Sequence, residues 1–187
     1  MTALRDDALA LLRDWHTSEP RQEALRREYV DHLDVHPDGA DRACVPNHLT
    51  AGALILSADH TRVLLTLHSK ARRWFHTGGH CEPQDSTLVG AALREATEES
   101  GVPGLTIDPE PLQLDAHWVA FCGSSQRVQH LDVRFLALAP AEAEPVVSEE
   151  SLDVRWWPVD GLPTDDGDML TMTRLALERA SQASSAS

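Results

Sequence analysis

The chain has 187 residues, of which 42% are hydrophobic, and this length and composition suit one compact domain with a modest extension. Its formal net charge is -14, and Lys70 is the single lysine. So acidic a chain repels nucleic-acid backbones, and it lacks the run of about 18 apolar residues that a membrane span needs. We therefore expect no nucleic-acid polymer and no membrane as partner; a phosphorylated small molecule is compatible where a bound cation or a local basic patch offsets the charge.

The N-terminal sequence mixes charged residues throughout, unlike a secretory signal. The three cysteines, Cys44, Cys81 and Cys122, have no metal-ligand spacing, and their odd number argues against a disulfide framework. We therefore expect reduced thiols and a cytoplasmic location.

Residues 1–46 read as a helical extension. Apolar positions recur with helical spacing over 3–16, and a second helical pattern runs through Leu25, Tyr29 and Leu33 before the stretch 36–39 ends it. An exposed apolar stripe must be covered, so we expect the helices to pack on the domain; packing on a partner subunit is the alternative.

From residue 49 the pattern changes to short alternating segments, and residues 47–183 are predicted to form the main domain. A strong helix spans 87–100 and stops at Gly101, a last helix covers 168–180, and residues 184–187 are expected to be a disordered tail. The order of strands and helices predicts an α/β fold, a mixed sheet with helices on both faces. The predicted strands are 49–57, 62–67, 112–115, 118–122, 131–138 and 154–157.

Three carboxylates share one face of the helix 87–100. Glu95, Glu98 and Glu99 stand at i, i+3 and i+4, where like charges repel unless something offsets them. A hard divalent cation, Mg²⁺ or Mn²⁺, would do so, and Arg94 is spaced to hold Glu98 in place. The alternative without a metal is a solvated, glutamate-rich helix face. The double glycine Gly78-Gly79 argues against it, because a carbonyl of that turn can face the same ion.

The segment from Gly79 to Val102 resembles the Nudix box, a glycine followed at fixed spacing by an Arg-Glu-apolar-x-Glu-Glu-x-Gly-apolar run. The whole second half of the box is present from Arg94 to Val102. Two departures occur: Asp85 replaces the first-half glutamate with one extra residue before Arg94, and Thr77 replaces a proline. The resemblance implies that Asp85 supports the loop more than it binds metal.

This resemblance implies a Nudix-type α/β/α sandwich that hydrolyses a nucleoside diphosphate linked to another group, with Mg²⁺ or Mn²⁺ as cofactor. It also implies that Arg94 orients the glutamates, that Glu149 or Glu150 is a candidate general base, and that a homodimer is one assembly to expect. The implied metal ligands are the Gly78 carbonyl, Glu95, Glu98 and Glu99; the implied catalytic residues are Arg94, Glu95, Glu98, Glu99 and Glu150.

Five further residues are candidates for substrate binding. His130, Asp132 and Arg134 alternate onto one strand face, either lining a pocket or forming a salt-linked outer face. Arg72 and Arg73 precede the box and either steer an anionic substrate or are ordinary surface charges.

Three other interpretations are weaker. A zinc site at His80-Cys81-Glu82 is disfavoured because adjacent loop residues rarely chelate one ion and no further ligand pair has suitable spacing. A catalytically silent nucleotide sensor would have damaged helix carboxylates. An isopentenyl-diphosphate isomerase would need a catalytic cysteine with its own motif and histidine metal ligands, for which Cys81 and His80 are a poor match, and isomerases depart from the second half of the box that this chain keeps. We keep both as alternatives to the hydrolase.

Overall fold

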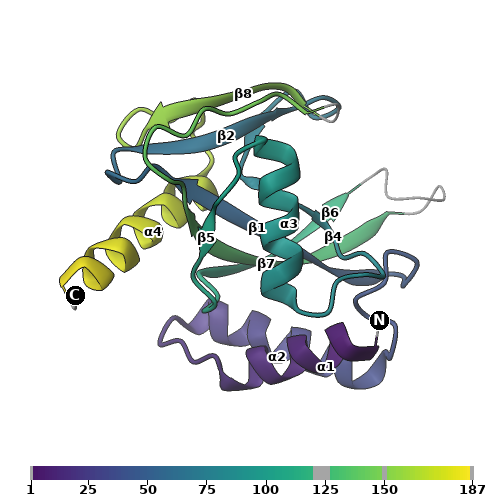
Figure 1. The fold of residues 1–187 in the computed structure, drawn as a ribbon. Coiled ribbons are helices and arrows are strands. Elements are labelled where there is room, and N and C mark those ends of the chain that lie inside the picture. Colours follow the sequence, from purple (N-terminus) through teal and green to yellow (C-terminus); the bar gives the residue numbers. More distant parts are fainter. Residues whose placement is uncertain (1, 120–126, 149–150, 186–187) are drawn as a thin grey trace.

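A computed structural model describes residues 2–119, 127–148 and 151–185 (Figure 1). Among these residues no helix is long and apolar enough to cross a membrane. The elements follow one another as α1 (Thr2–Asp14), α2 (Pro20–Val35), β1 (Asn47–Leu56), β2 (Arg62–His68), β3 (Trp74–Phe75), β4 (Thr77–His80), α3 (Leu88–Ser100), β5 (Thr106–Ile107), β6 (Gln113–Val119), β7 (Val128–Leu138), β8 (Ser151–Pro158) and α4 (Gly167–Ser185).

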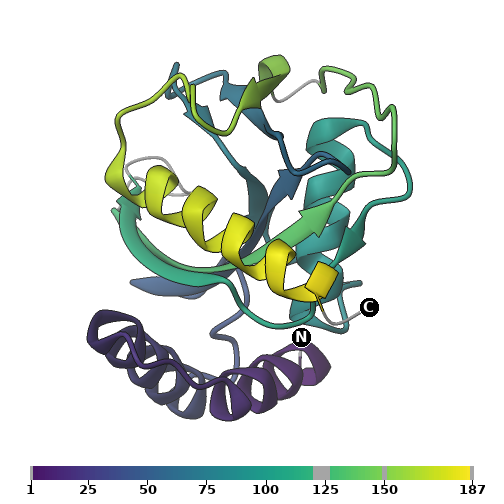
Figure 2. The same ribbon diagram turned by 90° about the vertical axis from the view of Figure 1, so that its left-hand side faces the viewer.

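Across the described residues the strands form one mixed sheet with the central order β3-β2-β1-β7-β5. Strands β1 and β7 run parallel along their whole length, and β4, β6 and β8 add antiparallel partners to β1, β7 and β2. Helices α3 and α4 lie on opposite sides of this sheet, as the two views in Figures 1 and 2 show. The structure thus has the predicted α/β/α arrangement.

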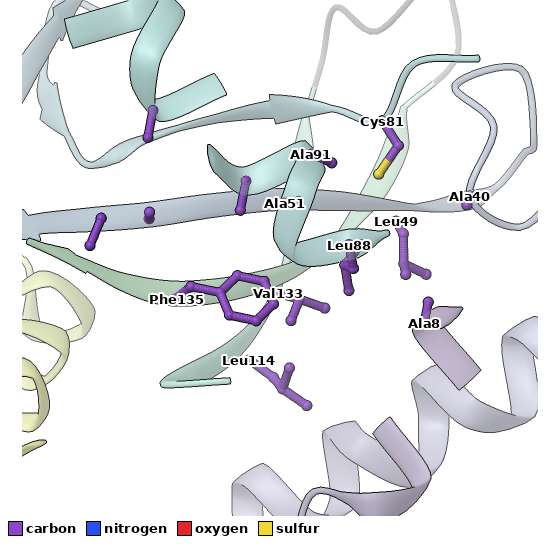
Figure 3. Close-up of a cluster of buried hydrophobic side chains, with 14 of the residues drawn as sticks. Ala8, Ala40, Leu49, Ala51, Cys81, Leu88, Ala91, Leu114, Val133 and Phe135 are labelled. Carbon is purple, nitrogen blue, oxygen red and sulfur yellow. The ribbon is translucent and has the colours of Figure 1, made fainter. Parts of the chain in front are cut away.

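Strand alternation divides the core into two apolar clusters. Leu49, Ala51 and Ala53 of β1 face α3, and Figure 3 shows Ala51 and Leu49 beside Leu88 and Ala91 of that helix. The next positions of β1, Leu54 and Leu56, reach the other cluster, which α4 covers with methionine side chains. Fully burying one such side chain stabilises the fold by about 1.5–3 kcal/mol.

The N-terminal helices pack on their own domain, as expected. Leu4, Leu12 and Leu33 are fully buried in the same cluster as α3. Two polar contacts fix α2 to the sheet: the Tyr29 hydroxyl donates to the Asp115 carbonyl (2.6 Å), and the Gln22 amide bonds the Leu114 backbone in both directions (2.9 and 2.6 Å). Among the described strands β6 pairs with β7 alone, and Gln22 satisfies backbone groups along its other edge.

Several predicted boundaries change. The two strands predicted at 112–115 and 118–122 are one strand, β6, and α4 runs on through Ser185 into the predicted tail. Strands β3, β4 and β5 were missed because two to four residues are too few to show an alternating pattern. Cys122, Glu149 and Glu150 lie outside the described residues.

Candidate active site

Helix α3 is fixed at both ends. The Thr87 hydroxyl accepts a hydrogen bond from the Gly90 N–H (3.0 Å), and Gly101 ends the helix in the left-handed conformation, with φ of 66°. Ala91 and Ala92 are fully buried in the apolar cluster between the helix and the sheet. Gly90 is exposed instead and lies beside the capping Thr87 rather than at the sheet.

The glycine pair of β4 makes room for the carboxylates of α3. A Cβ added to Gly79 would lie 2.7 Å from Oε2 of Glu95, so only glycine lets that carboxylate rest against the strand. A Cβ on Gly78 would lie 2.7 Å from the Cα of Gly52, its partner on β1. The Gly78 N–H donates to Oε2 of Glu99 (3.1 Å). The double glycine thus forms a shallow cradle that fixes two of the three predicted metal ligands.

Arg94 joins the box loop to the helix. Its guanidinium pairs with both oxygens of Asp85 (3.1 and 2.9 Å), with Glu95 and Glu98 (2.9 Å each) and with the His80 carbonyl (3.0 Å). These hydrogen bonds, the pair donated to Asp85 foremost, raise the pKa of Arg94 above its ordinary value. The predicted contact between Arg94 and Glu98 is confirmed, and Arg94 also orients Glu95.

Asp85 keeps its place despite the extra residue in the loop. Burial alone would raise the pKa of Asp85, but hydrogen bonds from Arg94 and from the Glu82 N–H (2.8 Å) outweigh it and lower the pKa. The carboxylate is therefore charged and serves the loop, in line with the expected supporting role. The loop, with its extra residue, is linked to α3 through Asp85 and Arg94.

Oxygen donors suited to a hard cation surround this cradle. Glu98 is 60% exposed and can reach an ion in solvent, whereas Glu95 is mostly buried at 13%. In the described ranges the three glutamates do not form one tight ligand group; the tight groups all contain histidine. Mg²⁺ keeps several waters and takes few carboxylates directly, so well-spaced oxygens fit it better than a closed cage.

The polar face of β7 continues across neighbouring strands. Arg134 donates to Asp132 and Asp115 (2.8 Å each), and Thr50 of β1 donates to Asp132 (2.9 Å). Burial would raise the pKa of Asp132, but contacts with His76 and Arg134 outweigh it and lower the pKa well below its usual range. Asp132 and Arg134, two of the predicted substrate-binding residues, are thus salt-linked. This agrees with the alternative of a salt-linked face, but both side chains are buried rather than on an outer face.

Sequence reasoning missed the β6 side of this network. Gln113, Asp115 and His117 lie opposite Arg134, Asp132 and His130 in the β6–β7 pairing. Their alternation with Leu114 and Ala116 was a readable signal, hidden by dividing β6 into two strands.

Arg72 and Arg73, the basic pair before the box, lie in the loop between β2 and β3. Arg73 pairs with Asp166 before α4 (3.2 Å) and stacks over Phe75, while Arg72 has a φ of 55° in the loop before β3. Glu150, the predicted general base, lies outside the described residues.

The NUDIX domain family model matches residues 46–175, well over half of the chain. The chain therefore belongs to the Nudix family. At the family level it is a Nudix pyrophosphohydrolase. No curated protein matches the sequence.

Solved structures share the fold. A NUDIX-family hydrolase from Clostridium perfringens is 24% identical with a TM-score of 0.55, over 71% of this chain and 97% of its own. An Ap4A hydrolase from C. elegans is 19% identical with a TM-score of 0.55, over 72% and 98%. A UDP-X diphosphatase is 14% identical with a TM-score of 0.55, over 94% and 93%, an extent that includes most of the N-terminal extension.

Proposed function

We propose that this chain hydrolyses the phosphoanhydride bond of a small nucleoside-diphosphate derivative with the help of Mg²⁺ or Mn²⁺. The observation that carries the proposal is the cradle at β4, where the glycine pair and Arg94 hold Glu95, Glu98 and Glu99 on one side of α3. Such charge concentration costs stability unless a cation offsets it. The ligands proposed are these glutamates and the Gly78 carbonyl.

Each residue has a distinct role in this proposal. When bound, the cation would supply charge stabilisation at the phosphoryl group and a lower pKa for the attacking water. Glu98, largely exposed, is placed to meet the ion first, and Glu99 is oriented by the Gly78 N–H. Arg94 positions the carboxylates and donates a hydrogen bond of 2.9 Å to Glu95. Glu150 remains the proposed general base.

The substrate is proposed as a phosphorylated small molecule, with His130, Asp132, Arg134, Arg72 and Arg73 as candidate contacts. Arg134 already has two carboxylate partners, so its positive charge is balanced before any phosphate arrives. We therefore expect the cation to provide most of the attraction for substrate phosphates. The isomerase alternative is disfavoured because burial raises the pKa of the Cys81 thiol to about 12, which removes the thiolate.

The test is a hydrolysis panel with Mg²⁺ or Mn²⁺. ADP-ribose, dinucleoside polyphosphates, nucleoside triphosphates and nucleotide sugars are incubated with the protein, and the products are separated to identify the bond cut. We expect one class to be cleaved and Glu98→Gln to lower its kcat by at least about a hundredfold. Glu28→Gln, an exposed residue of α2, is the matched control and should keep wild-type turnover. Tight binding of one compound without turnover would support the silent sensor instead.

A further inference from the structure

Three histidines from three strands meet on the polar face of the sheet. His48 on β1 is the register partner of His130 on β7, and His80 on β4 pairs with Thr50, two residues along β1. The ring centroids of His48 and His80 are 5.1 Å apart, those of His48 and His130 5.1 Å, and those of His80 and His130 4.9 Å. The three residues are distant in sequence and come together only through the sheet.

Each ring offers one nitrogen to a common point, and the three nitrogens lie within 4.8 Å of one another. Nδ1 of His48 faces the Cys44 carbonyl at 3.0 Å, and because a carbonyl only accepts, that nitrogen carries the hydrogen. The lone pair of a neutral His48 ring is then on Nε2. A backbone carbonyl that fixes the tautomer in this way is a common partner of metal-bound histidine.

His130 supplies a second sign of a missing ligand. Its Nε2 is buried, and within the described parts of the chain it has no hydrogen-bond partner. A buried polar atom of this kind costs about 1–3 kcal/mol unless something satisfies it. A neutral imidazole keeps one nitrogen lone pair, and this lone pair is what binds a metal.

We propose that His48, His80 and His130 form a Zn²⁺-binding site, separate from the carboxylate site on α3. Imidazole nitrogens favour Zn²⁺ over Mg²⁺, which prefers oxygen, so the two sites select different ions. In a tetrahedral zinc site, Zn–N bonds of about 2.0–2.1 Å place ligand nitrogens about 3.3 Å apart. The three rings would therefore draw together on binding.

The site has access to solvent on the side of His80. A cavity of about 380 Å³ opens there, lined by Asp41, Arg42, His80, Cys81, Glu82 and Pro83. Three protein ligands leave the fourth zinc position for water or another small ligand, and we infer that the ion enters from the cavity beside His80. The His80 carbonyl also accepts from Arg94, so one residue connects both sites.

The test measures zinc directly on the full chain. Competition with a chromophoric chelator should give one Zn²⁺ per chain, and X-ray absorption should show nitrogen or oxygen neighbours at about 2.0–2.1 Å with an imidazole outer shell. His48→Gln and His130→Gln should each weaken zinc binding about tenfold or more, because losing a direct ligand costs at least as much as losing an outer partner. Exposed His16→Gln should bind like wild type.

A second group, His36, Asp38 and Cys44, is the rival site, and Cys44→Ser separates the two because it keeps the carbonyl that faces His48. A sulfur neighbour at about 2.3 Å, a loss of zinc in Cys44→Ser, or sub-stoichiometric binding would overturn the proposal. The X-ray spectrum of the wild type decides the matter even where a buried histidine variant does not fold. A Glu98→Gln/Glu99→Gln variant should keep its zinc, so failure of the hydrolase proposal stays distinguishable.

Discussion

Replacing Arg94 with alanine should destabilise the protein far more than removing an ordinary helix arginine. Arg94 is 17% exposed, and its partners Asp85 and Glu95 are 6% and 13% exposed. The substitution leaves two poorly solvated carboxylates without their cation, and removing one partner of a fully buried pair costs about 3–5 kcal/mol. Allowing for the partial exposure of this group, we expect the free energy of unfolding to fall by about 2–4 kcal/mol.

The chain contains a matched control. Arg174 forms the same i,i+4 pair with Glu178 on α4, but their side chains are 59% and 54% exposed. Arg174→Ala makes the same change in net charge and should cost less than about 0.5 kcal/mol. Arg94→Lys should fall between, because lysine keeps the charge but loses the two-pronged bond to Asp85.

Urea unfolding followed by circular dichroism at pH 7 measures all three variants against the wild type. Equal losses for Arg94→Ala and Arg174→Ala would refute the reasoning, since they would show that the Arg94 contacts add nothing to a surface pair.

Three further predictions concern the strand, the histidines and the extension. Gly78→Ala should lower the free energy of unfolding by about 1–3 kcal/mol, because the added Cβ would lie 2.7 Å from the backbone of β1. Gly167→Ala, whose Cβ would meet nothing within 4 Å, should change the free energy of unfolding little, and equal shifts in melting temperature would contradict this. In metal-free protein the pKa of His130 is lowered to about 3, so below pH 6.5 the unfolded chain binds a proton that the folded chain does not. As the pH falls from about 6.5 to 3, the free energy of unfolding should therefore fall by up to about 1.4 kcal/mol per pH unit. His130→Gln should flatten this slope in melts at pH 7, 6 and 5, and an unchanged slope would exclude the effect. Leu33→Ala should cost about 2–5 kcal/mol in one cooperative transition, and a separate early transition would show that the extension unfolds alone.

Local patterns predicted the parts of the fold that depend on short-range physics. The spacing of Glu95, Glu98 and Glu99 on one helix face follows from helix geometry, and Gly101 marked the end of that helix. The link from Asp85 to Arg94 was harder to predict, because the packing of strand and helix decides the path of the loop between them. The sequence was therefore enough to recognise the box, but not to predict the contact between Asp85 and Arg94.

Contacts between strands could not be read in the same way. His48, His80 and His130 are separated by 32 and 50 residues, and their meeting depends on the parallel register of β1 and β7 and on the short strand β4. The sequence argument rejected zinc at His80 because no second ligand pair was in view, and only the sheet supplies the other two rings. Register is a property of the whole sheet, so no local spacing reveals it.

The most direct test of the central claim is Mn²⁺ binding to metal-free protein, followed by electron paramagnetic resonance of the free ion. The account predicts that the wild type and Glu28→Gln bind Mn²⁺, and that Glu98→Gln/Glu99→Gln binds at least about tenfold more weakly. Equal Mn²⁺ affinity in all three proteins would show that the carboxylates of α3 do not hold the metal and would contradict the account.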